Sequence, residues 1–293
     1  MKYRKLEGTD LTVPQYVLGT GDYASNVPAD IARDLLKTYV DCGGTMLDTS
    51  HYYGSFLVGG RSLSECLVGD FLQENHLREQ VLISTKGCCY ATNKPYEKRM
   101  TPAFLRSDLT ESLRNLHTDY IDFYWLHQDD PSQPVGAILE ELNRCVEEGK
   151  IRYFGCSNWK IERILEADAY AEAHGLRKFS ANQVMLNMAY PNMTAVDELI
   201  QTWLTPGMRK YHERTQRPVF AYCSQASGFF YNCFKDDYME NIKEVLTKLL
   251  LADGVSGDED FACSIAATIL REFGEVTYRD NGSVILTMGD KSS

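Results

Sequence analysis

The chain has 293 residues, which suits one large barrel-type domain of roughly 250 residues better than two ordinary domains. Its 30 basic and 41 acidic residues give a formal charge of -11, whereas binding nucleic acid through its phosphates favours a basic surface. We therefore expect no nucleic-acid partner. No run approaches about 18 apolar residues and the start of the chain has no apolar signal core, so we also expect no membrane insertion and no secretion.

The nine cysteines are scattered along the chain, and none lies in a C-x-x-C pair. An odd number with no such spacing indicates reduced thiols rather than a framework of disulfides. This pattern predicts a cytoplasmic location and no metal site.

Short apolar runs alternate with amphipathic helical patterns through most of the chain. The predicted strands are residues 16–18, 45–47, 81–84, 121–126, 152–154, 179–183 and 219–222. Between them, apolar residues repeat about every 3.6 residues, in 31–40, 63–71, 105–116, 138–146 and 161–165. The alternation is typical of strand-helix units around a parallel sheet, and at this length it predicts an α/β fold of the TIM (β/α)8 barrel type.

The start of the chain precedes these repeats. Residues 3–6 and 11–13, joined around Gly8, predict an N-terminal β-hairpin that plugs one end of the barrel. No linker rich in Pro, Gly or Ser and no low-complexity tract interrupts the sequence, so we expect a single domain over residues 1–293.

The end of the chain is harder to assign. Residues 238–251 and 261–273 have helical patterns, and the final strand is either 275–278 or 284–287. Six residues follow Thr287, so we expect the last outer helix of the barrel to be missing or divergent. An uncovered apolar surface there would favour self-association.

Most of the predicted strands end at a polar residue or are followed by one within three positions. In chain order these residues are Asp48, Lys86, His127, Ser157, Gln183 and Tyr222, separated by 38, 41, 30, 26 and 39 residues. Each separation is long enough for one loop, one helix and one strand. Because active sites of α/β barrels lie at the C-terminal ends of the strands, we expect the six residues to converge on one pocket.

Four residues of this region fit the chemistry of an acid catalyst. Tyr53, five residues after Asp48, has an unperturbed pKa near 10, so a nearby cation helps it to give up its proton near neutral pH. Lys86 supplies the cation, Asp48 orients it, and a neutral His127 hydrogen-bonds a substrate carbonyl. Taken singly, each residue also has a simpler interpretation: Asp48 as a turn cap, Tyr53 as a packing residue, Lys86 as a salt bridge and His127 as a core histidine.

The motifs around these residues resemble those of the aldo-keto reductases. Residues 47–54, Leu-Asp-Thr-Ser-His-Tyr-Tyr-Gly, match the family's tyrosine five after an aspartate and directly before a glycine. Further motifs follow in the family's order: Ser84-Thr85-Lys86, Trp125-Leu126-His127, Gly155-Cys156-Ser157-Asn158 and Ala181-Asn182-Gln183. The resemblance extends over residues 3–231 and weakens after residue 251.

The resemblance implies a catalytic tetrad and a nicotinamide cofactor. The tetrad would be Asp48, Tyr53, Lys86 and His127. The residues at the cofactor would be Gly19, Thr20, Gly21, Asp48, Ser157, Asn158, Gln183, Tyr222, Ser224, Gln225, Ser227, Lys291 and Ser292. Among them, Ser157, Asn158 and Gln183 would hold the nicotinamide carboxamide and Tyr222 would stack on its ring. Gly19, Thr20 and Gly21 fit a plain strand-to-helix turn equally well. Ser224, Gln225 and Ser227 would line the pyrophosphate. Lys291 and Ser292 would contact the 2'-phosphate of the adenosine, so the expected cofactor is NADPH, with NADH as the alternative.

The leading hypothesis is an oxidoreductase that reduces the carbonyl of a small aldehyde or ketone to an alcohol. One alternative is a catalytically slow NADP-binding sensor or partner subunit on the same fold, which the divergent C-terminus favours and the intact tetrad disfavours. The other alternative is an aldolase that forms a Schiff base at Lys86.

Overall fold

A computed structural model describes residues 1–55, 62–89, 99–188 and 201–226, together with the backbone of 275–278 and 284–287. The chain divides into two compact units, Met1–Ser224 and Gln225–Ser293. The single domain expected over residues 1–293 stays a prediction.

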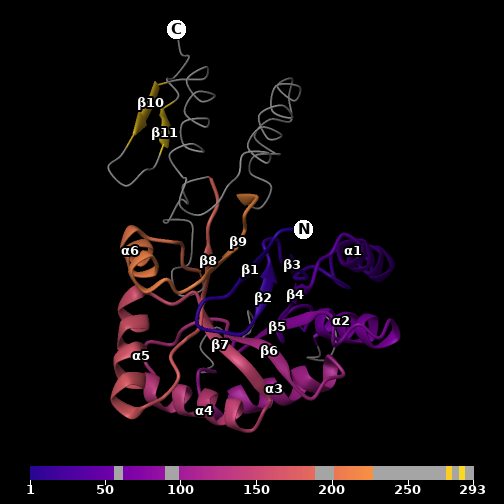
Figure 1. Ribbon diagram of the computed structural model, residues 1–293, viewed down its shortest axis with the longest axis horizontal. Helices are drawn as coiled ribbons and strands as arrows, with labels where there is room; N and C mark the ends of the chain where they lie inside the picture. Colours follow the sequence, from indigo (N-terminus) through magenta and orange to yellow (C-terminus); the bar gives the residue numbers. More distant parts are fainter. Residues whose placement is uncertain (56–61, 90–98, 189–200, 227–274, 279–283, 288–293) are drawn as a thin grey trace. The chain divides into compact units, whose positions relative to one another are not determined.

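The first unit is built around a parallel sheet whose seven strands lie side by side in their chain order (Figure 1). The strands are β3 (Leu18–Gly19), β4 (Met46–Asp48), β5 (Leu82–Gly87), β6 (Ile121–Leu126), β7 (Ile151–Ser157), β8 (Asn182–Met185) and β9 (Val219–Tyr222). The helices between them are α1 (Ala29–Asp41), α2 (Leu63–Glu74), α3 (Pro102–Asn115), α4 (Val135–Glu147), α5 (Ile161–His174) and α6 (Pro206–Thr215). Parallel strands joined in order by single helices are the architecture of the TIM (β/α)8 barrel, which confirms the predicted fold class. The described residues supply seven of its strands.

Local sequence signals set the ends of several helices. The Thr101 side chain accepts a hydrogen bond from the Phe104 amide at 3.4 Å, and Pro102 occupies the first position of α3. Gly175 ends α5 in the left-handed conformation, with φ of 66°. Helices that begin and end at these points bury one side in the core around the sheet, as the fully buried Leu105 of α3 illustrates.

The N-terminal hairpin forms as predicted, from β1 (Tyr3–Lys5) and β2 (Thr12–Pro14) paired antiparallel. Gly8 lies between the two strands with a φ of 74°, a conformation that suits glycine. Apolar side chains of the hairpin pack in one core cluster with interior residues of the barrel: Leu6, Leu11 and Val13 with Met46, Phe123, Trp125 and Ala181. Because Met46 opens β4, the hairpin covers the N-terminal ends of the strands.

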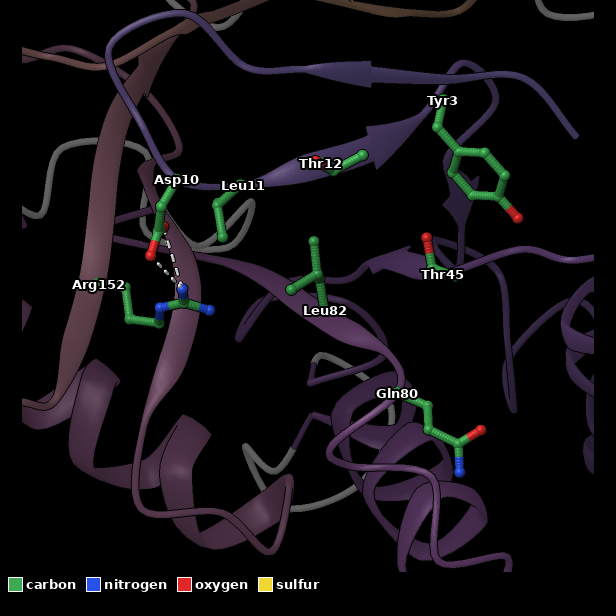
Figure 2. Close-up of a pocket in the computed structure, with 8 residues that line it drawn as sticks. All are labelled: Tyr3, Asp10, Leu11, Thr12, Thr45, Gln80, Leu82 and Arg152. Atoms are coloured by element: carbon green, nitrogen blue, oxygen red, sulfur yellow. Dashed lines mark hydrogen bonds and ion pairs between the residues drawn. The ribbon is translucent and has the colours of Figure 1, made fainter.

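A cavity of about 370 Å³ lies between this hairpin and the N-terminal ends of the strands (Figure 2). Its lining includes Leu82, which opens β5, and Arg152 near the start of β7. The Arg152 guanidinium is already ion-paired with Asp10 at 3.1 Å. The cavity therefore belongs to the end of the sheet opposite to the predicted site.

The strands predicted at 121–126 and 219–222 have the predicted bounds in the structure, and the other five differ: they run over Leu18–Gly19, Met46–Asp48, Leu82–Gly87, Ile151–Ser157 and Asn182–Met185. For two of them, the first and the sixth, the contacts explain the difference. The first runs over Leu18–Gly19 rather than 16–18. Tyr16 is exposed, and its carbonyl accepts a hydrogen bond from the Tyr39 hydroxyl (2.8 Å) instead of from a neighbouring strand. The sixth runs over Asn182–Met185 rather than 179–183, because pairing with β9 begins only at Asn182. The side chain of Phe179, before that point, packs edge-on against other aromatic rings of the core.

Both candidates for the final strand of the barrel form strands, β10 (Glu275–Tyr278) and β11 (Val284–Thr287). They pair antiparallel with each other in a separate sheet, so the expectation that one of them is the last strand of the barrel is wrong. The sequence between them contains Asn281-Gly282, the dipeptide that most strongly favours a hairpin turn. The helices predicted at 238–251 and 261–273, and the missing helix after Thr287, lie outside the described residues.

Candidate active site

The structure brings the four predicted catalytic residues together at the C-terminal ends of β4, β5 and β6. Lys86 of β5 is only 1% exposed, and its Nζ lies 2.5 Å from Oδ2 of Asp48. The same ammonium donates to the Thr49 carbonyl at 2.8 Å and to the Tyr53 hydroxyl at 3.3 Å. His127, directly after β6, places its ring edge-on to the Tyr53 ring, with centroids 5.7 Å apart. One buried cation thus connects the carboxylate to the tyrosine.

Two residues of the motifs, whose role the sequence did not reveal, hold the Asp48 carboxylate in place. The Ser84 hydroxyl donates to Oδ1 of Asp48 at 2.7 Å, and Nε1 of Trp125 donates to the Ser84 hydroxyl at 2.7 Å. Because β4 pairs with β5 and β5 pairs with β6, Asp48, Ser84 and Trp125 lie on three neighbouring strands, within hydrogen-bond distance of one another in turn. With its other oxygen fixed by Ser84, Asp48 presents Oδ2 to Lys86.

Burial changes the acid-base behaviour of this group in different directions. It raises the pKa of Tyr53 above the usual value, and the adjacent Lys86 ammonium draws that pKa partly back down. It also acts to lower the pKa of Lys86, but the Asp48 carboxylate and the Tyr53 hydroxyl hold that pKa above its usual value. Burial, with the Lys86 charge, lowers the pKa of His127 to about 3. At neutral pH the site therefore holds a protonated tyrosine, an ammonium and a neutral imidazole.

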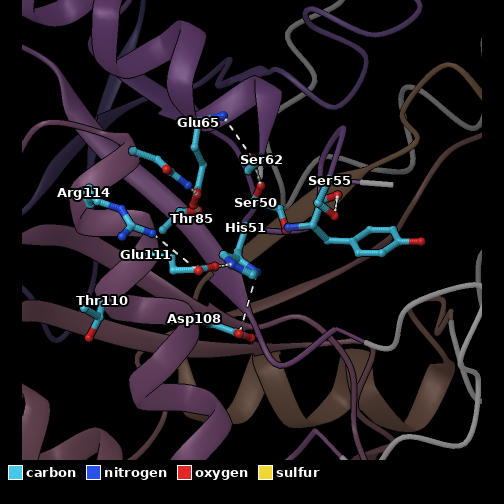
Figure 3. Close-up of polar contacts among 12 residues, drawn as sticks. Ser50, His51, Ser55, Ser62, Glu65, Thr85, Asp108, Thr110, Glu111 and Arg114 are labelled. Atoms are coloured by element: carbon cyan, nitrogen blue, oxygen red, sulfur yellow. Dashed lines mark hydrogen bonds and ion pairs between the residues drawn. The ribbon is translucent and has the colours of Figure 1, made fainter. Parts of the chain in front are cut away.

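The segment after β4 carries Tyr53 and is anchored to the helices behind it (Figure 3). Nε2 of His51 lies 2.6 Å from a carboxylate oxygen of Glu111 on α3, 60 residues further along the chain. Glu65, buried in the first turn of α2, accepts a hydrogen bond from the Thr85 hydroxyl at 2.6 Å. Burial raises the pKa of Glu65. These contacts hold the backbone on both sides of the tetrad.

The residues expected around a nicotinamide lie at the end of β7, within β8 and at the end of β9. The side-chain amide of Asn158 bonds to protein groups: Oδ1 accepts from the Thr202 amide at 3.0 Å and from the Tyr222 hydroxyl at 2.6 Å. Its Nδ2 donates to the His127 carbonyl at 2.9 Å and to the Ser157 hydroxyl at 3.1 Å. Asn158 thus ties the loop after β7 to His127, and its contact with a cofactor stays a prediction.

Gln183 is buried and pairs with Ser157 across β7 and β8. It lies inside β8 rather than at its end, because the strand continues to Met185. The parallel register nevertheless keeps Gln183 level with Ser157, the last residue of β7.

The three residues expected near the cofactor after β3 differ in their surroundings. Gly19 ends β3 and is exposed, as is Gly21, where a Cβ would lie 3.8 Å from the Tyr53 ring. The buried Thr20 hydroxyl instead contacts the Ser64 hydroxyl at 2.8 Å and donates to the Asp48 carbonyl at 3.1 Å. These bonds use the Thr20 side chain to join β3, β4 and α2.

The predicted phosphate contacts fall only partly within the described residues. Ser224 and Gln225 follow β9 and are exposed. The other three, Ser227, Lys291 and Ser292, lie outside the described residues.

Within the described ranges, no cluster of His, Cys, Asp or Glu side chains has the arrangement of a metal site. Over those same ranges, no helix is both long and apolar enough to span a membrane. Seven cysteines lie in this part of the chain, and none forms a disulfide.

Several known proteins are similar to this chain. It is 29% identical over 181 residues to the aldo-keto reductase YhdN of Bacillus subtilis, covering 60% of this chain and 53% of the relative. It is 30% identical to an aryl-alcohol dehydrogenase of Pestalotiopsis microspora (53% of this chain, 40% of the relative) and to a norsolorinic acid reductase of Aspergillus flavus (57% and 42%). The chain thus spans about half or less of the length of these relatives.

The fold is similar to the crystal structure of an aldo-keto reductase from Klebsiella pneumoniae in complex with NADPH. That match has a TM-score of 0.59 and 27% identity, and it covers 77% of this chain and 69% of the other. A model of the aldo/keto reductase family matches residues 16–246, which include the four predicted catalytic residues together with Ser157, Asn158, Gln183 and Tyr222. The chain therefore belongs to the aldo/keto reductase family.

Proposed function

We propose that the protein reduces the carbonyl group of a small aldehyde or ketone to an alcohol, with NADPH as the hydride donor and Tyr53 as the general acid. The observation that carries the proposal is the position of the Lys86 ammonium, within hydrogen-bond distance of both the Asp48 carboxylate (2.5 Å) and the Tyr53 hydroxyl (3.3 Å). A tyrosine with this neighbour is prepared to release its proton to a developing alkoxide.

The residues at this end of the sheet fit a nicotinamide cofactor. Ser157 and Gln183 offer a hydroxyl and a carboxamide, groups that pair with the amide of a nicotinamide. A Cβ at Gly19 would meet no atom within 4 Å, so the space beside the end of β3 is open. The structural relative in complex with NADPH supports the same cofactor here. When bound, the reduced nicotinamide supplies the hydride.

The chain's own residues account for the proton. As the substrate oxygen gains negative charge, Tyr53 donates its phenolic proton to it, and the phenolate left behind faces the Lys86 ammonium. Lys86 keeps its own proton because Asp48 holds the pKa of Lys86 high. His127 is neutral and donates a hydrogen bond that holds the carbonyl oxygen near Tyr53.

The Schiff-base alternative fits the same geometry poorly. A nucleophilic amine must be unprotonated, whereas the pKa of Lys86 lies above its usual value and Nζ donates to three oxygen atoms. Borohydride with a carbonyl substrate would trap an adduct at Lys86 if the aldolase interpretation were correct.

The test has a binding part and a turnover part. Fluorescence titration with NADPH and with NADH measures cofactor affinity, and loss of NADPH absorbance with a panel of aldehydes and ketones measures turnover. Tyr53→Phe is expected to lower turnover by about two to four orders of magnitude with little change in NADPH affinity. Tyr16→Phe, at a tyrosine 62% exposed on the outside, is the matched control. A Tyr53→Phe enzyme with more than half of the wild-type rate would refute the role of Tyr53.

A further inference from the structure

Ser50 lies in the loop after β4 that carries Tyr53, and its hydroxyl faces His127 just after the end of β6. Ser50 is fully buried, and its Oγ is 3.0 Å from Nδ1 of His127. The same oxygen accepts a hydrogen bond from the Tyr52 amide at 3.2 Å, one residue before the proposed acid. A single atom therefore contacts both the imidazole ring and the backbone beside Tyr53.

The position of the hydroxyl proton determines which tautomer His127 adopts. A hydroxyl has one proton to donate, and the acceptors within reach are Nδ1 of His127 at 3.0 Å and the Lys86 carbonyl at 3.3 Å. The Lys86 carbonyl already accepts from the His51 amide at 3.0 Å. The imidazole nitrogen is thus the nearer acceptor and the one that still lacks a donor from the backbone.

We propose that Ser50 is a positioning residue that donates its hydroxyl proton to Nδ1 of His127 and so fixes the imidazole in the tautomer with its proton on Nε2. A neutral imidazole carries one proton, so an acceptor role at Nδ1 makes Nε2 the donor. The proposal rests on the proposed function for its catalytic meaning, since an Nε2–H donor is what a substrate carbonyl requires.

The direction of this hydrogen bond determines what His127 offers a substrate. If the Ser50 proton pointed to the Lys86 carbonyl, Nδ1 would carry the imidazole proton and Nε2 would be an acceptor that repels a carbonyl oxygen. Ser50 also sets the ring plane, because Nδ1 must point at a hydroxyl fixed by the Tyr52 amide. A fixed ring then presents the other nitrogen in one direction.

Nitrogen chemical shifts of the histidine side chains test the tautomer without cofactor or substrate. Protein labelled with ¹⁵N-histidine is compared with its His127→Gln variant, which identifies the His127 signals. Wild type is expected to have an unprotonated Nδ1 and a protonated Nε2 at neutral pH. Ser50→Ala is expected to give averaged shifts of a tautomer mixture, and Ser50→Thr, which keeps the hydroxyl, is expected to retain the wild-type pattern. A protonated Nδ1 in wild type, or an unchanged tautomer in Ser50→Ala, would overturn the proposal.

Kinetics provide the second readout. Ser50→Ala is expected to lower kcat about tenfold, the effect of one lost hydrogen bond, with a smaller change in KM. Ser50→Thr should recover most of the rate. Ser55→Ala is the matched control, because Ser55 donates to the Tyr52 carbonyl in the same loop at 2.8 Å. If wild type gives the expected tautomer but reduces no carbonyl, the proposed function fails and the assignment to Ser50 stands. If it reduces carbonyls and Ser50→Ala leaves kcat unchanged, the positioning role fails.

Discussion

Replacing Lys86 with methionine is expected to destabilise the protein far more than the same replacement of Lys37. Both lysines lie 2.5 Å from a carboxylate oxygen, Lys86 from Asp48 and Lys37 from Asp41. The side chains of the first pair are 2% and 15% exposed, and those of the second are 68% and 61% exposed. The comparison keeps the substitution and the distance to the carboxylate constant, while the burial differs. Lys86 also donates to the Thr49 carbonyl and the Tyr53 hydroxyl, which adds to the expected loss.

The expected loss follows from the geometry of the buried pair. At an effective dielectric constant of about 20, two unit charges about 2.5 Å apart attract each other by about 6–7 kcal/mol. Desolvation of both ions offsets much of this, and removing one partner of a buried pair destabilises proteins by about 3–5 kcal/mol. Because Asp48 keeps some exposure and its bond to Ser84, we expect a loss near the lower end, about 3 kcal/mol. Lys37→Met should leave the stability nearly unchanged.

Urea unfolding followed by circular dichroism measures these effects, with Asp48→Asn added in the wild-type and Lys86→Met backgrounds. Asp48→Asn should lower the free energy of unfolding less in the Lys86→Met background than in wild type, because in that background it removes the carboxylate charge that has lost its partner. The pKa of Lys86 is raised on folding, so its contribution is complete below about pH 10 and is lost as the pH rises through the folded pKa. Equal shifts of the unfolding midpoint for Lys86→Met and Lys37→Met would refute this reasoning.

Three further predictions concern the same site. Because the pKa of His127 is lowered to about 3, its neutral form persists from that pH upward, and kcat/KM should have no acid limb near pH 6.5; a limb there that disappears in His127→Gln would contradict this. Ser84→Ala removes the hydroxyl that holds Asp48, and kcat measurements should find it lowered about tenfold; an unchanged kcat would mean that Lys86 alone fixes the carboxylate. In Gly87→Ala the new Cβ would overlap the buried Tyr124 hydroxyl, which has no hydrogen-bond partner among the described residues, so the temperature of thermal unfolding should fall below that of wild type. Tyr124→Phe should partly restore that temperature, and equal losses with and without Tyr124→Phe would exclude this clash.

The sequence alone identifies the tetrad region because its residues interrupt apolar runs. Lys86 and His127 each follow buried strand residues, where a charged or polar side chain requires a specific partner. Parallel strands in chain order then bring such positions to one end of the sheet. For the same reason, the sequence could predict that Ser157 and Gln183 lie side by side on neighbouring strands, even though the bounds of β8 differ from the prediction.

The supporting contacts were not predictable in this way. In the sequence, Ser84 resembles any small residue of a strand. Its role depends on the register that aligns it with Asp48 and on the hydrogen bond from the indole of Trp125. The bond between His51 and Glu111 joins residues 60 positions apart, and no local pattern specifies such a pair. These contacts are consequences of packing rather than of periodicity.

The two bases of the site differ in charge because of the groups that face them. Lys86 meets the Asp48 carboxylate, so its charged form is favoured in spite of burial. His127 meets the Ser50 hydroxyl and the Lys86 cation, and both its desolvation and that cation favour the neutral ring. A carboxylate in place of Ser50 would favour the imidazolium, as in sites where histidine transfers protons. In the proposed mechanism, a neutral partner instead restricts His127 to hydrogen bonding, and proton donation is left to Tyr53, whose anion would face the Lys86 ammonium.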